Sequence, residues 1–220
     1  MLTIKEFATA TAFLECTEAT LSRHELENNL ILGVPLRIQQ GIKQESPENL
    51  FLAVLKDGAL AGAAVMTPPF HLIVHVEREA EGAGEAVLHA LVEAALPHRQ
   101  RVTGVNGRVP WVDAFVRVWT ERTGKPMRIE MIERLYVLRE VIWPDAVEGA
   151  LRRCTMEDLE TAAHFFNDFF ADTLRHETME DSLETMRAAI EQERLYFWEV
   201  AEKNIGGAVG KPVCMVGKSR

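Results

Sequence analysis

The sequence contains little cysteine. Its 220 residues include three cysteines, Cys16, Cys154 and Cys214. They are far apart and form no Cys-x-x-Cys pair, which argues against both a disulfide framework and a structural zinc site. The spacing therefore favours a protein of a reducing compartment without a bound metal.

Long hydrophobic runs are also missing. The longest apolar stretch, residues 60–74, is interrupted by Pro68 and Pro69, so we expect no membrane-spanning helix. Near the start of the chain, Lys5 and Glu6 stand where a signal peptide needs apolar residues. The sequence therefore predicts a cytoplasmic protein that does not act at a membrane.

Positive charge is in the minority. The chain has 24 Lys and Arg residues against 33 Asp and Glu, which gives a net charge of -9. A nucleic-acid surface needs a concentrated basic patch, so nucleic acid is not an expected partner. Hydrophobic residues make up 47% and charged residues 26%, which is typical of a folded globular protein.

The first half of the chain predicts two helices followed by a hairpin. Thr3 with Glu6 and Ser22 with Glu25 have the S/T-x-x-E spacing that caps a helix start, and Gly33 and Pro35 are expected to end the second helix. Residues 50–56 and 59–66 then predict two strands joined by a tight Asp57-Gly58 turn.

A glycine-rich turn follows the most apolar strand. Residues 70–76 are apolar on both faces, which favours a central strand. The chain continues through Gly82, Ala83 and Gly84 into a helix of about twelve residues. Small residues at a helix start let backbone N–H groups approach an anion, so this turn is a candidate phosphate cradle; the alternative is a tight connection without a ligand.

Three further elements complete a first domain. We expect a strand at residues 102–106, a helix that starts at Pro110, and a long strand at residues 127–138, where apolar and polar residues alternate. The order is α-α-β-β-β-α-β-α-β. It predicts an α/β (α+β) fold with a mixed, mainly antiparallel sheet flanked by helices over residues 1–142, followed by a linker at residues 143–150.

Residues 151–220 predict a partial second copy of the first domain. Thr155 with Asp158 and Thr178 with Asp181 each mark a helix start, and residues 195–200 and 212–216 predict two strands joined by a glycine-containing turn at residues 201–211. The counterpart of the central strand and glycine turn is not among these residues. We expect about 70 residues of the second copy to be absent from this chain.

Several segments carry a resemblance to a known family. They are Glu27–Gly33 (ENNLILG), Phe51–Val54 (FLAV), Gly62–Phe70 (GAAVMTPPF), Thr123-Gly124, Arg134–Tyr136 (RLY), and Trp198-Glu199 with Pro212-Val213. With the predicted element order they resemble the GNAT superfamily of N-acetyltransferases. The closer resemblance is to bacterial tandem members with a degenerate N-terminal domain and an active C-terminal one.

The resemblance implies transfer of an acetyl group from acetyl-CoA to an amine. In this family the pantetheine arm of the cofactor lies along the central strand, and a Q/R-x-x-G-x-G/A turn holds its pyrophosphate. Here the turn reads Glu79-x-x-Gly82-x-Gly84, and carboxylates repel a pyrophosphate. We therefore expect the first domain to bind acetyl-CoA poorly and the chain to have weak or no activity. The alternatives are a complete single-domain enzyme and a non-catalytic GNAT-like module that forms a homodimer through exposed strand edges.

Other candidate residues each have a functional and a structural interpretation. Asn28 and Asn29 are candidate acceptor-binding residues, or they serve the local helix end. His71 and His75 are about 13 Å apart along a strand, too far for one metal ion, and are interpreted as hydrogen-bonded core or cleft residues. Tyr136 is a candidate general acid, or it makes a core or interdomain contact. The sequence assigns no catalytic residue.

Overall fold

The computed structural model describes residues 1–142, 147–171, 178–200 and 213–217. The chain divides into two compact units, Met1–Arg139 and Glu140–Arg220, and each is described by itself.

The first unit begins with a strand, where the sequence predicts a helix. β1 (Leu2–Phe7) pairs antiparallel with β2 (Leu50–Lys56), with Leu2 opposite Lys56 and Phe7 opposite Phe51. The capping pattern at Thr3 is therefore misleading, because the backbone of these residues finds its hydrogen bonds across the sheet. α1 (Ala10–Leu21) starts later, and its N-cap residue Thr9 accepts a hydrogen bond from the amide of Ala12 at 3.2 Å.

The second helix also differs from the prediction. Ser22 opens a short 3₁₀ turn, η1 (Ser22–His24), and α2 (Asn29–Gln39) begins five residues after that turn. Neither Gly33 nor Pro35 ends α2. Pro35 is buried on the same helix as Ile31 and Ile38, and this apolar packing compensates for the backbone hydrogen bond that proline cannot donate.

The central part of the unit matches the predicted element order. β2 and β3 (Ala59–Met66) form the predicted hairpin; Asp57 and Gly58 both have positive φ angles, 51° and 88°. β4 (Leu72–Val76) then leads through η2 (Arg78–Ala83) into α3 (Gly84–Ala95) and η3 (Leu96–His98). The last two elements are β5 (Val105–Gly107) and α4 (Trp111–Thr123).

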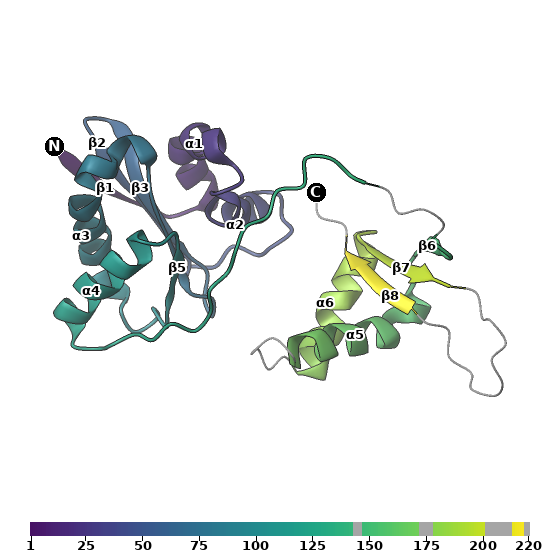
Figure 1. The fold of residues 1–220 in the computed structure, drawn as a ribbon. Coiled ribbons are helices and arrows are strands. Elements are labelled where there is room, and N and C mark those ends of the chain that lie inside the picture. Colours follow the sequence, from purple (N-terminus) through teal and green to yellow (C-terminus); the bar gives the residue numbers. More distant parts are fainter. Residues whose placement is uncertain (143–146, 172–177, 201–212, 218–220) are drawn as a thin grey trace. The chain divides into compact units, whose positions relative to one another are not determined.

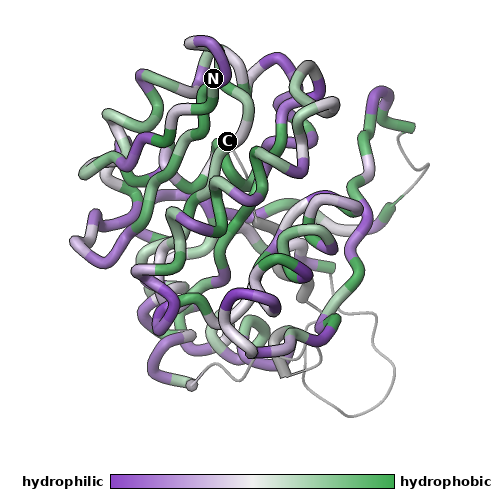
Figure 2. Tube along the Cα trace, turned by 90° about the vertical axis from the view of Figure 1, so that its left-hand side faces the viewer, coloured by the Kyte–Doolittle hydropathy of each residue, from purple (hydrophilic) through white to green (hydrophobic). Residues whose placement is uncertain are grey.

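The first unit is a sheet between two helical layers. The strand order is β1-β2-β3-β4-β5, antiparallel from β1 to β4, with β5 parallel to β4. α1 and α2 lie on one face of the sheet and α3 and α4 on the other (Figure 1). Each face has its own buried core, one around Phe13 and Phe51 and one around Leu88, Phe115 and Trp119. Hydrophobic stretches run through the middle of the unit (Figure 2).

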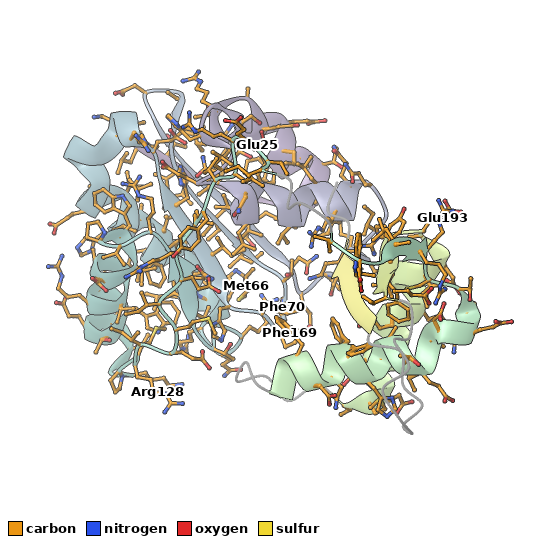
Figure 3. All side chains as sticks on the ribbon, turned by 45° about the vertical axis from the view of Figure 1, so that its right-hand side comes forward. Glu25, Met66, Phe70, Arg128, Phe169 and Glu193 are labelled. Carbon is orange, nitrogen blue, oxygen red and sulfur yellow. The ribbon has the colours of Figure 1, made fainter. Side chains whose placement is uncertain are left out.

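The strand predicted at residues 127–138 is not formed. The chain after α4 has no assigned secondary structure up to residue 142. Met127 packs against the core on the α3 and α4 side, whereas Ile129 and Tyr136 are 77% and 84% exposed. Arg128 is exposed on the same segment (Figure 3). Alternation alone does not make a strand, and β5, with three residues, offers a short edge for pairing.

The second unit repeats the opening of the first. β6 (Ala150–Arg153), η4 (Met156–Asp158), α5 (Leu159–Ala171), α6 (Met179–Glu191), β7 (Leu195–Glu199) and β8 (Val213–Gly217) follow one another. The strands pair antiparallel in the order β6-β7-β8, as β1-β2-β3 do.

Two of the predictions for this unit are confirmed and one is incomplete. The capping boxes at Thr155 with Asp158 and at Thr178 with Asp181 are both present. The sequence predicts two strands, but the unit has a third, β6, whose residues the prediction left unassigned. The predicted turn at residues 201–211 lies outside the described residues.

Among the residues described, no helix is long and apolar enough to span a membrane.

Candidate functional site

The candidate site lies where β4 and β5 end. Of the strand pairs that the structure describes, β4–β5 is the one parallel pair, with Leu72 opposite Val105 and Val74 opposite Gly107. The carboxyl ends of parallel strands meet at one edge of a sheet, and ligands of α/β proteins bind outside such ends. α3 and α4 begin at this same edge, directly after η2 and residue 110.

The two glycines of the predicted phosphate turn have different surroundings. Gly82 is exposed, and a Cβ added to it would meet nothing within 4 Å. Gly84 is buried as the first residue of α3, and a Cβ there would lie 2.4 Å from Cη2 of Trp111. Ala83, the N-cap of α3, makes no side-chain capping bond. The packing of Trp111 thus requires a residue without a side chain at position 84, whereas position 82 has room for one.

The helix start next to this turn carries negative charge. Glu85 lies in the first turn of α3, and its Oε1 atom pairs with Nη2 of Arg117 at 2.8 Å. The turn itself contains Glu79 and Glu81. Carboxylates at a helix N-terminus interact favourably with the positive end of the helix dipole. They therefore take the electrostatic role that a bound phosphate would have there.

A buried hydrogen bond between a histidine and a glutamate lies on the α1 and α2 face of β4. Nε2 of His75 lies 2.8 Å from Oε1 of Glu77, and the two side chains are 11% and 1% exposed. His75 is therefore hydrogen-bonded and largely buried, as predicted. The sequence interpretation missed Glu77; the available signal was an acidic residue two positions after a histidine at the end of an apolar strand.

Three charged side chains meet at the same sheet edge. Arg78 follows β4 and Arg108 follows β5, and both contact the carboxylate of Glu27 from the loop between α1 and α2. Nη1 of Arg108 lies 3.6 Å from Oε2 of Glu27, and Arg78 bonds the other oxygen, Oε1. The sequence interpretation missed this cluster. The signal was an arginine just after each of two predicted strands.

The two candidate acceptor residues point to different environments. Asn28 is buried, and its Nδ2 atom donates to the carbonyl oxygen of Leu21 at 2.9 Å, which fixes the loop between α1 and α2. Asn29 is exposed as the first residue of α2. A role for either in acceptor binding stays a prediction.

Other residues singled out in the sequence lie away from the end of β4. His71 precedes β4 and lies 3.9 Å from Glu130, between their Nε2 and Oε2 atoms. Tyr136 is exposed, so its interpretation as a core residue is wrong, while an interdomain contact stays a prediction. Phe70, labelled in Figure 3, lies under the ammonium group of Lys43, 4.6 Å from the ring centre.

A shallow depression of about 430 Å³ lies elsewhere in the first unit. It is lined by Leu96, Arg99, Val102, Thr103, Trp119, Arg122, Thr123, Lys125, Pro126 and Met127. These residues come from the ends of η3 and α4 and from the segments that follow them, so the depression does not include the glycine turn. The described residues contain no group of three or more His, Cys, Asp or Glu side chains arranged to hold a metal ion.

Comparisons with known proteins show little similarity. No protein-family model matches the chain, and no curated protein matches it. Among solved structures, the chain has a distant match to an aminoglycoside acetyltransferase from an uncultured soil metagenomic sample, in complex with sisomicin. The two share 13% identity over 63% of this chain and 97% of that chain, with a TM-score of 0.28. A likeness of this degree carries no argument about function.

Proposed function

We propose that this chain belongs to an N-acetyltransferase that takes its acetyl group from acetyl-CoA, and that its first unit is a degenerate domain. In this proposal the first unit holds the pantetheine arm weakly beside β4, contributes little to phosphate binding and does not perform acetyl transfer.

The observation that carries the proposal is the parallel β4–β5 pair at the edge of an otherwise antiparallel sheet. With η2 and α3 directly after β4, this places a glycine-containing turn at the carboxyl end of the parallel pair. β5 pairs with β4 over Leu72–Val74 only, so past Val74 the backbone of β4 can hydrogen-bond an amide-containing arm as it would another strand.

Three features at or near the turn support weak phosphate binding. The ring of Trp111 occupies the space beside Gly84, at the start of α3. Glu85 in the first helical turn brings a negative charge to the place where a pyrophosphate would need positive potential. The nearby Arg78 and Arg108 are already paired with Glu27.

Isothermal titration with acetyl-CoA and with acetyl-pantetheine, which lacks the phosphates, tests the proposal. Because the arm and not the phosphates supplies the contacts, we expect the two dissociation constants to agree within about threefold, both at or above about 1 mM. No thiol release above background is expected with a panel of amines.

Two results would contradict the proposal. Micromolar binding of acetyl-CoA, at least tenfold tighter than acetyl-pantetheine, would mean that the phosphate turn is intact. Absence of binding for both compounds at about 10 mM would mean that β4 does not receive the arm.

A second candidate function is a non-catalytic module that forms a homodimer. It is favoured by the segment that follows α4, where nine large apolar side chains are at least 48% exposed. They are Ile129, Met131, Ile132, Leu135, Tyr136, Val137, Leu138, Val141 and Ile142. Exposed apolar surface of this extent marks interaction sites. Sedimentation equilibrium at high protein concentration would exclude this candidate if the chain stayed monomeric.

A further inference from the structure

The depression of about 430 Å³ lies at the opposite end of α3 and α4 from the glycine turn. Both helices begin at the sheet edge where β4 and β5 end, whereas the depression is lined by η3, the last part of α4 and the segments that follow them. α3 has 12 residues, so about 18 Å separates its two ends. The depression is therefore distinct from the glycine turn, and its volume is within the range of roughly 300–1,000 Å³ found for small-molecule sites.

The most buried residues of the lining are apolar. Val102 and Trp119 are 8% and 2% exposed and belong to the core on the α3 and α4 side, and Leu96 and Met127 pack against that core. A ligand with a hydrocarbon part gains from contact with such residues, because the contact removes apolar surface of both from water.

Three residues of the lining carry a positive charge and none is acidic. They are Arg99, Arg122 and Lys125, and all three are exposed. Nη2 of Arg122 pairs with Oε1 of Glu93 at 2.7 Å, and Nη1 of Arg99 donates a hydrogen bond to the carbonyl oxygen of Leu96 at 3.4 Å. Within the described part of the chain, only the backbone of Lys125 is hydrogen-bonded, so its ammonium group can bind an anion without breaking an existing bond.

We propose that this depression binds a small amphipathic monocarboxylate, with the carboxylate held by Lys125 and Arg99 and the hydrocarbon part lying against the apolar residues of the lining. A guanidinium group has several N–H donors, so Arg99 can bind the ligand and keep its bond to the backbone. The negative charges of Glu93 and Glu121 and the carboxyl ends of the two helix dipoles offset part of the positive charge here. This favours a monoanion over a phosphate dianion. The site does not depend on acetyl transfer.

NMR titration of the ¹⁵N-labelled chain with sodium hexanoate, sodium acetate and 1-hexanol at constant ionic strength tests the site. Acetate lacks the hydrocarbon chain, and hexanol lacks the charge. We expect hexanoate to cause saturable amide shifts at residues 96–103 and 119–127. It should bind at least about tenfold more tightly than acetate and about fivefold more tightly than hexanol. Equal affinity for hexanoate and either other compound, or shifts centred on the exposed residues 129–142, would overturn the proposal.

Two variants separate the charged contact from the apolar one. Lys125→Gln and Arg99→Gln should each weaken hexanoate binding at least about threefold and leave hexanol binding unchanged, because only the carboxylate loses a partner. Lys56→Gln is the matched control: Lys56 is an exposed lysine at the end of β2, outside the lining, so its loss should leave the affinity unchanged. Circular dichroism establishes that each variant is folded.

Unchanged hexanoate affinity in Lys125→Gln or Arg99→Gln, or equal losses in Lys125→Gln and Lys56→Gln, would overturn the proposal. Micromolar acetyl-CoA binding would contradict the proposed function and leave this site intact.

Discussion

At the residue scale, Gly82 and Gly84 have the same place in the sequence motif and different places in the packing. The motif predicts that both serve an anion, since small residues expose backbone amides. In the folded unit, Gly84 makes room for Trp111, and Gly82 borders open space. A single sequence cannot separate these roles, because Trp111 is 27 positions away and reaches Gly84 only through the packing of α3 and α4.

Substitution of the two glycines by alanine distinguishes these roles. Gly84→Ala places a methyl group 2.4 Å from the Trp111 ring, so we expect a loss of about 1–3 kcal/mol in the free energy of unfolding. Gly82→Ala, the control, should change it by no more than about 0.5 kcal/mol. Urea unfolding followed by circular dichroism measures both, and equal effects would contradict the packing role of Gly84.

Asp158 is a second residue whose surroundings predict a measurable effect. Its two carboxylate oxygens accept hydrogen bonds from Arg152 at 2.8 and 2.9 Å, and Oδ2 also accepts one from the amide of Thr155. The hydrogen bonds from Arg152, with a smaller contribution from Thr155, lower the pKa of Asp158 to about 2, although partial burial opposes the shift.

The pH dependence of stability follows from this lowered pKa. The stabilisation is present above the ordinary pKa of 3.8 and is lost as the pH falls towards about 2, because the unfolded state binds the proton first. We expect Asp158→Asn to remove this acid-dependent loss and to lower stability at pH 7 by more than about 1 kcal/mol, because it weakens the cap and removes the ion pair with Arg152. Unfolding curves between pH 2 and pH 7 test this. Asp181→Asn removes the corresponding carboxylate of the α6 capping box, so it should cause only the smaller loss of the cap at pH 7 and retain the acid dependence that Arg152 causes.

At the element scale, the sequence correctly predicts those elements whose determining residues lie close together in the chain. The Asp57-Gly58 hairpin and the capping boxes of α5 and α6 depend on residues within four positions of one another, and all three are confirmed. The wrong predictions concern segments whose secondary structure depends on pairing with a strand far away in the sequence. β1 has a capping pattern but pairs with β2 some fifty residues later, and residues 127–138 alternate without a partner strand. The Glu27 cluster was missed for the same reason.

The hairpin turn gives a test at this scale. Gly58 has a φ angle of 88°, which a β-branched residue adopts only at a cost, so we expect Gly58→Val to destabilise the first unit by about 1–2 kcal/mol. Gly33→Ala is a control that should change the stability in the opposite direction. Gly33 lies inside α2 with open space around it, and alanine should stabilise the helix by up to about 1 kcal/mol. Thermal unfolding that ranks Gly58→Val above Gly33→Ala in stability would contradict both assignments.

At the scale of the whole molecule, the second unit repeats the strand pairing and helix order with which the first begins. β1-α1-α2-β2-β3 and β6-α5-α6-β7-β8 have the same order and the same antiparallel neighbours. Such a repeat supports the proposal of two related domains, at residues 1–142 and 151–220 with a linker between them. Residues 143–146 of that linker lie outside the described part of the chain.

Limited proteolysis tests the exposed segment after α4. Residues 128–139 contain Arg128, Arg134 and Arg139, have no assigned secondary structure and are exposed. We expect trypsin to cut there before it cuts anywhere within residues 2–123, because protease sites must unfold locally to fit an active site. Mass spectrometry of the early fragments identifies the cuts, and an earlier cut within α4, at Arg117 or Arg122, would contradict this account of the first unit.

The most direct test of the proposed function is an NMR titration of the ¹⁵N-labelled chain with acetyl-CoA. We predict amide shifts confined to residues 72–84 and 105–111, at the parallel β4–β5 pair and its following turns, that saturate only at or above about 1 mM. Saturation at micromolar acetyl-CoA, or shifts that avoid β4 and β5, would contradict the account of a degenerate acetyl-CoA site in the first unit.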